Sequence, residues 1–133
     1  LLKLLSILIE RFINVYTLVC IMFLNKKDLV RINQEIGETG EFHNEGCVDF
    51  AFSSLKRQRS WLYICAYLLR SLLTDHAFRD GNKRTSLAVV MTYLEAQGIP
   101  YDKLGLTVTI HQIANKNIKD INKITRMINH VIL

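Results

Sequence analysis

Apolar side chains recur with helical spacing along residues 61–72, and this is the strongest periodic pattern in the chain. Positions i, i+3, i+4, i+7, i+8 and i+11 are occupied by Trp61, Ile64, Cys65, Leu68, Leu69 and Leu72. This spacing places these side chains on one face of an α-helix and predicts that the face is buried. The same helix would deliver the backbone directly to His76.

Other stretches repeat the helical pattern. Asn25 is a favourable N-cap residue, and Gly37 is a favourable end for the helix that would follow it. Further apolar stripes predict a short helix over residues 48–55, a helix carrying Leu87, Val90, Met91 and Leu94, and one last helix from Ile110 to Val131. Residues 37–46, rich in glycine and glutamate, predict a surface loop. We therefore predict one all-α domain.

The composition agrees with a compact folded domain. The chain has 133 residues, half of them hydrophobic, and a single proline. Its formal charge of +5 favours acidic partners or nucleotides, but cations and anions alternate along most of the sequence, so a solvated basic surface is the simpler interpretation.

Cytoplasmic location is expected, because Cys20, Cys47 and Cys65 show neither a CxxC pair nor a zinc-binding spacing and predict reduced, buried thiols. Residues 12–24 are mostly apolar but short for a membrane span, so we expect a buried helix there, with a membrane-associated segment as the alternative.

The segment from His76 to Thr85, HAFRDGNKRT, combines residue types suited to phosphate chemistry. A helix is predicted to begin within it, and the free N–H groups of a helix N-terminus attract anions. Lys83 and Arg84 add positive charge and donors for phosphate oxygens. Asp80 beside a phosphate would suit Mg²⁺, and His76 could accept a proton from an attacking hydroxyl. The residues indicate chemistry on a nucleotide.

This segment resembles the signature of the Fic/Doc superfamily, His-x-Phe-x-(Asp/Glu/Asn)-(Gly/Ala)-Asn-(Gly/Lys)-Arg. Lysine in the eighth position, with Thr-Ser-Leu after the arginine, is closer to the Doc (death-on-curing) branch than to Fic proper. With about 5% average usage per residue type, a chance match to this signature is expected on the order of once in 10⁸ starting positions. The resemblance extends more weakly from about Phe23 to the C-terminus. It implies a single Fic/Doc-like helical bundle over residues 23–133, with the motif loop between two central buried helices. Residues 1–22 would form an N-terminal helical extension with no assigned role.

The resemblance implies a role for each matching residue. His76 is expected to be the general base; its alternative is a buried structural histidine. Asp80 is expected to hold Mg²⁺ between nucleotide phosphates, although it could cap the next helix, and Phe78 is expected to anchor the loop. The residues expected to bind the nucleotide phosphates are Gly81, Asn82, Lys83, Arg84 and Thr85. The remaining histidines, which are isolated in the sequence and expected to be non-catalytic, are His43, His111 and His130.

Two reactions are compatible with the resemblance, and both use ATP. Fic enzymes commonly transfer AMP to a protein hydroxyl and use a second arginine for the nucleotide phosphates; Leu87 occupies that position here. The Doc branch transfers phosphate from ATP, bound in a reversed orientation, to a threonine of the translation elongation factor Tu. Because Leu87 and Lys83 both follow the Doc pattern, we predict a toxin that phosphorylates a Ser or Thr hydroxyl, with nucleotide transfer as the alternative.

A non-catalytic basic helical module that binds nucleic acid or protein is a further alternative. It would be expected to interleave aromatic residues with cations on an exposed face. Trp61, Tyr63 and Tyr67 instead lie in or beside the apolar stripe of a predicted helix, so the sequence carries no strong nucleic-acid signal.

The resemblance also implies partners. Doc-like toxins are neutralised by a small antitoxin whose disordered tail folds on the toxin, and we expect such a partner besides the target protein. Residues 6–10, SILIE, resemble the inhibitory helix of Fic proteins, but Arg11 breaks the last position of that pattern, so an ordinary helix is favoured. The flap with which family members align their target corresponds here to the short basic connector at residues 55–60, and no residue of it is assigned a role.

Overall fold

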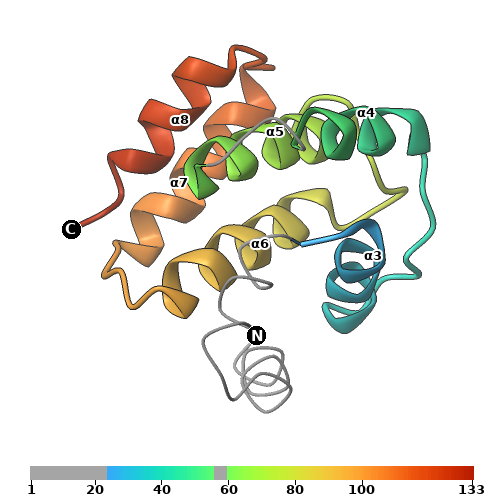
Figure 1. The fold of residues 1–133 in the computed structure, drawn as a ribbon, viewed down its shortest axis with the longest axis horizontal. Helices are drawn as coiled ribbons and strands as arrows, with labels where there is room; N and C mark the ends of the chain where they lie inside the picture. Colours follow the sequence, from blue (N-terminus) through green and yellow to red (C-terminus); the bar gives the residue numbers. More distant parts are fainter. Residues whose placement is uncertain (1–23, 56–59) are drawn as a thin grey trace.

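The computed structural model describes residues 24–55 and 60–133. These residues form α-helices and no strand (Figure 1). In chain order the helices are α3 (Lys26–Glu35), α4 (Glu45–Leu55), α5 (Trp61–Leu73), α6 (Asn82–Ala96), α7 (Lys103–Asn115) and α8 (Ile121–Asn129). The predicted all-α class is confirmed. Two predicted segments lie outside the described residues. They are the extension over residues 1–22, which includes the SILIE segment and Cys20, and connector residues 56–59.

Helix α5 lies at the centre of the bundle and contacts α4, α6, α7 and α8. The predicted apolar face is buried at Ile64, Cys65, Leu68, Leu69 and Leu72, and Trp61 at its start is half-buried. Burial extends to Ala66, Ser71 and Leu73 on the other sides of the helix. The predicted helix after the motif is also present, and α6 packs along α5 (Figure 1). The two helices flank the motif loop as predicted.

Helix α3 begins at the predicted N-cap. The Asn25 side chain accepts a hydrogen bond from the Asp28 N–H at 2.9 Å, and the Asp28 carboxylate accepts one from the Asn25 N–H at 3.1 Å. This reciprocal pair satisfies two N–H groups that a helix start otherwise leaves free. The helix ends at Glu35, two residues before Gly37, whose φ of 101° suits glycine.

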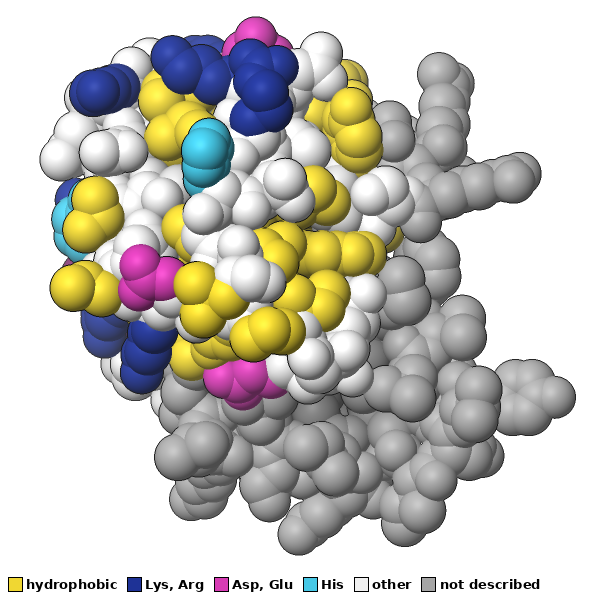
Figure 2. All heavy atoms as spheres, turned by 90° about the vertical axis from the view of Figure 1, so that its left-hand side faces the viewer, with side chains coloured by type: hydrophobic (Ala, Val, Ile, Leu, Met, Phe, Trp, Pro, Cys, Tyr) yellow, Lys and Arg dark blue, Asp and Glu magenta, His cyan; other side chains and the backbone are white. Residues whose placement is uncertain are grey.

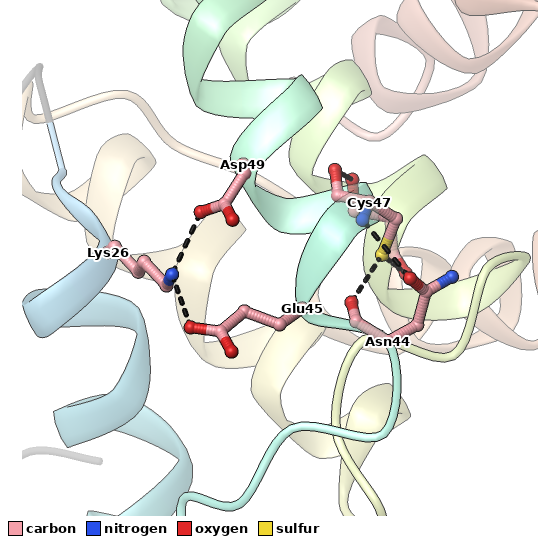
Figure 3. Close-up of polar contacts among 6 residues, drawn as sticks. Lys26, Asn44, Glu45, Cys47 and Asp49 are labelled. Carbon is pink, nitrogen blue, oxygen red and sulfur yellow. Dashed lines mark hydrogen bonds and ion pairs between the residues drawn. The ribbon is translucent and has the colours of Figure 1, made fainter.

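A polar clasp joins α3 to α4. Lys26 Nζ lies 2.5 Å from a Glu45 carboxylate oxygen and 2.8 Å from one of Asp49 (Figure 3). At the start of α4, the Asn44 side chain accepts a hydrogen bond from the Cys47 N–H at 3.2 Å. The ion pairs are solvent-exposed and contribute little stability individually. Together these contacts hold the start of α3 against the first turns of α4.

One helix prediction is wrong. The single last helix expected from Ile110 to Val131 is two helices, α7 and α8. Asn117 adopts a left-handed conformation with φ of 50°, which ends the helical path. Asp120 then starts α8 by accepting a hydrogen bond from the Asn122 N–H at 2.9 Å. Ile118, which lies between the two helices, is also buried. The helical spacing of apolar residues therefore continues across the break and gave no sign of it.

The surface carries few large apolar side chains. Within the described residues the exposed ones are Phe50, Leu104, Val108 and Leu133. On the face seen in Figure 2, apolar side chains spread across the middle while basic side chains gather in separate groups near the edges. None of the described helices combines the length and the apolar character that a membrane crossing requires.

We predict that Leu69→Ala destabilises the fold by about 2–5 kcal/mol, because Leu69 is fully buried in the central helix and its truncation leaves a cavity. Urea unfolding followed by circular dichroism would measure the change. The matched control is Leu104→Ala, since Leu104 is 74% exposed and its truncation should change stability by less than about 0.5 kcal/mol. Equal effects of the two substitutions would contradict the central position of α5.

Candidate functional site

The motif begins in the loop between α5 and α6, where His76 is exposed and adopts a φ of 52°. That left-handed conformation is uncommon for a residue other than glycine and requires support from its surroundings. Ala77 supplies the support. Its N–H donates to the Ser71 carbonyl at 3.1 Å, and its own carbonyl accepts from the N–H groups of His43 and Asn44 at 2.8 and 3.1 Å. The backbone beside His76 is therefore held from two directions.

Phe78 secures the middle of the loop. Its side chain is 1% exposed and stacks on Phe42, with ring centroids 4.8 Å apart. The Asn82 side chain accepts from the Phe78 N–H at 3.0 Å and donates to the Phe78 carbonyl at 2.9 Å, which closes the loop onto the start of α6. This geometry fits the anchoring role expected of Phe78. It also engages the oxygen and one N–H of the Asn82 side-chain amide in the loop.

The N-terminus of α6 is uncapped. The N-cap residue is Gly81, with φ of 76°, and no side chain caps the helix. The Asp80 carboxylate instead accepts from the Gly81 N–H at 2.8 Å, so the alternative of Asp80 as the cap is wrong. Among the hydrogen bonds of residues 24–55 and 60–133, none uses the backbone N–H groups of residues 82–84. Free N–H groups and the helix dipole favour an anion at this point.

Asn33 of α3 is a site-supporting residue that the sequence analysis missed. It is 1% exposed, and its amide nitrogen donates to the Asp80 carbonyl at 3.0 Å and to the Thr85 hydroxyl at 3.1 Å. Its amide oxygen accepts from the Gly40 N–H at 2.9 Å. Asn33 lies four residues after the fully buried Leu29 and hence on the buried face of α3. That position was the available signal, because a buried amide needs hydrogen-bond partners.

Thr85 does not lie where the sequence analysis expected it. Its side chain is fully buried, and its hydroxyl oxygen accepts the hydrogen bond from Asn33. It is absent from the described lining of the cleft, so a phosphate contact through its hydroxyl does not fit this geometry. Thr85 serves instead to join α6 to α3.

A cleft of about 660 Å³ lies in front of the motif. Its motif side includes His76, Asp80, Gly81 and the residues that begin α6. The opposite side comes from α7, and the side chains that α7 contributes are Thr107, Ile110, His111, Ala114 and Asn115. Leu73 and Leu87 add apolar surface. The cleft therefore has a charged end beside a more apolar wall, and its volume is in the range of small-molecule sites.

His111, which is isolated in the sequence and expected to be non-catalytic, lies near the motif in the structure. His111 lies in the cleft lining, and its Nδ1 is 2.9 Å from the Thr107 carbonyl. A proton on Nδ1 would satisfy this contact and leave Nε2 free. No local sequence signal relates His111 to His76, because only the packing of α7 brings the two to one cleft.

Arg84 also lines the cleft, but one edge of its guanidinium is already engaged. Nη1 donates to the Ile36 carbonyl at 3.1 Å, and Nη2 forms an ion pair with Glu38. Lys83 beside it is exposed. Two cations at a helix N-terminus oppose the helix dipole, so this arrangement suits a site that binds an anion.

Asp80 fits a magnesium site that a nucleotide would complete. Within the described residues no group of three or more His, Cys, Asp or Glu side chains is placed to hold a metal by itself. Mg²⁺ usually binds through one or two carboxylates together with phosphate oxygens. The Asp80 carboxylate lines the cleft, with one oxygen bonded to the Gly81 N–H. A single exposed carboxylate beside an anion site meets that requirement.

Thiol chemistry is not favoured at the described cysteines. Burial, with a smaller effect from the negative charge of Asp75, raises the pKa of Cys47 to about 11. Burial alone raises the pKa of Cys65 still further. Both thiols are therefore protonated at neutral pH, whereas the thiolate is the nucleophilic form.

The sequence matches the Fic/DOC family over residues 23–94, which is more than half of the chain. The chain belongs to the Fic/DOC family. The matched segment runs from the start of α3 through most of α6 and includes the whole motif, while α7 lies outside it. Members of this family are typically enzymes that transfer nucleotide moieties onto proteins, with ATP as the substrate and generally with Mg²⁺. No curated protein matches the chain.

We predict that Asn33→Ala lowers the free energy of unfolding of this Fic/DOC protein by about 2–4 kcal/mol, because it leaves the buried Thr85 hydroxyl and the partly buried backbone groups of Asp80 and Gly40 without their partner. Chemical denaturation would measure the loss. The neighbouring substitution Gln34→Ala is the control, since Gln34 is exposed and makes one long hydrogen bond of 3.4 Å. A loss no larger than the control's would show that the Asn33 network is not stabilising.

We predict that Cys47 reacts slowly with iodoacetamide at neutral pH. With its pKa raised to about 11, Cys47 carries roughly 100-fold less thiolate than an ordinary cysteine, and its rate should rise with pH up to about 11. Mass spectrometry that resolves each cysteine would measure the rates. The same cysteine in urea-unfolded chain is the control and should react at the ordinary rate. Equal rates in folded and unfolded chain would contradict the burial of this thiol.

Proposed function

We propose that this Fic/DOC protein transfers a phosphate group from ATP to a Ser or Thr hydroxyl of a target protein, with His76 as the general base. The observation that carries the proposal is the shared cleft. It brings His76, Asp80, Lys83 and Arg84 together at the uncapped N-terminus of α6. A base, a magnesium ligand and cations around an anion site are the groups that phosphoryl transfer requires.

The proposed reaction is an in-line displacement. His76 takes the proton of the target hydroxyl, and the hydroxyl oxygen forms a bond to the γ-phosphorus. The bond between that phosphorus and the bridging oxygen to the β-phosphate breaks, and ADP leaves. Because His76 is exposed on a firmly held loop, a protein-borne hydroxyl can reach it. Catalysis would rest on positioning and on neutralising charge around phosphorus.

The phosphates would be held at the start of α6. The backbone N–H groups of residues 82–84 and the side chains of Lys83 and Arg84 supply donors, and Gly81 permits close approach of the backbone. Asp80 would hold Mg²⁺, which neutralises phosphate charge when bound. Thr85 has no part in this assignment, because its hydroxyl is buried.

Leu87 supports phosphate transfer over AMP transfer. It lines the cleft at the position where Fic enzymes carry their second arginine. An apolar side chain at that position cannot hold a charged phosphate. The cations of the described cleft lining are then Arg79, Lys83 and Arg84, all in or beside the motif loop. This distribution favours an arrangement of the triphosphate different from that in Fic enzymes.

AMP transfer is the second candidate, and the α7 wall is compatible with it. Ile110 and Ala114 provide apolar surface, and Asn115 and His111 provide polar groups, so this wall could accommodate a nucleoside beside the anion site. In that case the α-phosphate would face the base. The two candidates differ in which phosphorus the target hydroxyl attacks.

Partners follow from the proposed branch. A target such as a translation elongation factor and a small antitoxin with a disordered tail are the protein partners that the Doc-like motif suggests, with the reaction taking place in the cytoplasm. Residues 23–133 would be the folded toxin domain. Its described helices share one continuous core, which supports a single domain.

The test compares ATP labelled in the γ- or the α-phosphate, with purified full chain and cell extract as acceptor. We expect protein labelling from the γ position, reduced by at least about 100-fold in His76→Ala because the general base is lost. The control is His130→Ala, a histidine outside the described cleft lining, which should leave labelling unchanged.

Labelling from the α position alone would replace phosphate transfer with AMP transfer. If neither nucleotide labels a protein and the chain also fails to bind ATP, the non-catalytic binding module would be the better hypothesis. Unchanged labelling in His76→Ala would contradict the role of His76.

A further inference from the structure

Arg84 of the motif is held from outside the cleft by the loop between α3 and α4. Its Nη1 donates to the Ile36 carbonyl at 3.1 Å, and its Nη2 pairs with the Glu38 carboxylate. Two nitrogens of one guanidinium are thus fixed by two groups of the same loop. The Arg84 side chain nevertheless remains 56% exposed, so its other N–H groups are accessible to a ligand.

Glu38 is itself firmly placed. Its side chain is 21% exposed, in contrast to the more exposed Arg84, and its backbone N–H donates to the Asn33 carbonyl at 3.1 Å. Its Cγ lies against Gly81, where a Cβ on that glycine would approach it to 2.6 Å. Glu38 therefore packs on the N-cap of α6, and this contact limits where the stem of its side chain can lie.

The carboxylate lies behind the cleft wall instead of inside the cleft. Arg84 and Gly81 line the cleft, whereas Glu38 and Ile36 are not among its described lining residues. A phosphate in the cleft would meet the free edge of the guanidinium while Glu38 keeps the other edge. This arrangement distinguishes Glu38 from an internal anion that occupies the phosphate position.

We propose that Glu38 is a positioning residue for nucleotide binding, which fixes the Arg84 guanidinium in its phosphate-binding orientation. The inference rests on the proposed function, because it assigns Arg84 to a phosphate of ATP. A long arginine side chain loses rotamer freedom when it binds a ligand, and a partner that fixes it beforehand lowers this cost. The negative charge also offsets the unfavourable position of a cation at a helix N-terminus.

The test is a double-mutant cycle on ATP binding, measured by calorimetry with the full chain and Mg²⁺. Glu38→Gln keeps the packing on Gly81 and removes only the charge, and we expect it to weaken ATP binding about 3- to 20-fold. Arg84→Ala should weaken binding further. In the Arg84→Ala background, Glu38→Gln should have no additional effect, because it acts through Arg84.

Glu45→Gln is the matched control. It removes the carboxylate of another ion pair, with Lys26, on α4 and outside the described cleft lining. It should leave the ATP dissociation constant within about twofold of the wild-type value. Thermal unfolding of each variant would establish that the fold is intact, and a purely structural role of Glu38 would not produce the coupling with Arg84.

Tighter ATP binding in Glu38→Gln would show that Glu38 competes with phosphate for Arg84 and would overturn the inference. Unchanged binding, or a loss that persists in the Arg84→Ala background, would overturn it as well. These results differ from failure of the proposed function itself. In that case the wild-type chain would not bind ATP, and the inference would be overturned together with the assignment on which it rests.

Discussion

The burial of α5 on nearly all sides is the constraint on which the other elements depend. This helix contacts α4, α6, α7 and α8, and its apolar residues form the middle of the core. Because burial of apolar surface is the main stabilising term in folding, the helices that cover α5 have little freedom in where they lie. The last turn of α5 and the first turn of α6 then leave only a short loop between them, and this loop carries His76 and Asp80.

A short loop beside a core has backbone groups that need partners. Amide side chains provide them here: Asn82 closes the loop on Phe78, and Asn33 joins the loop to α3 and α6. Phe78, stacked on Phe42, adds an apolar anchor. The base and the carboxylate are thus presented from a rigid support while remaining accessible, which is what a site that acts by positioning needs.

The charges at the start of α6 also divide into those that support the site and those left for a ligand. The helix dipole disfavours Lys83 and Arg84, yet both lie in its first turn. The negative charge of Glu38 offsets part of the unfavourable interaction between Arg84 and the helix dipole. Within the described residues Lys83 takes part in no ion pair, and Asn82, Lys83 and Arg84 of the first turn line the cleft. The arrangement is most favourable when an anion occupies the cleft.

Much of this fold was accessible from the sequence because its determinants are local. The Asn25 N-cap and the stripe from Trp61 to Leu72 each lie within one or a few helical turns, so they predicted the start of α3 and the position of α5 correctly. The motif from His76 to Arg84 is also contiguous, and it identified the family and the candidate site. The break at Asn117 escaped prediction, because the apolar spacing continues across a residue whose left-handed conformation leaves no mark in that pattern.

The amino-acid sequence by itself determined the helical class, the motif and the residue types available for phosphate chemistry. Only the tertiary structure decided which distant residues complete the site. Asn33 and Glu38 reach the motif from more than forty positions earlier in the chain, and His111 and Asn115 face it from α7. Helix packing also buries the Thr85 side chain in the core, where its hydroxyl accepts a hydrogen bond from Asn33. The physical reason is that such contacts depend on how the helices pack around α5, and packing between distant segments has no periodic signature along the chain.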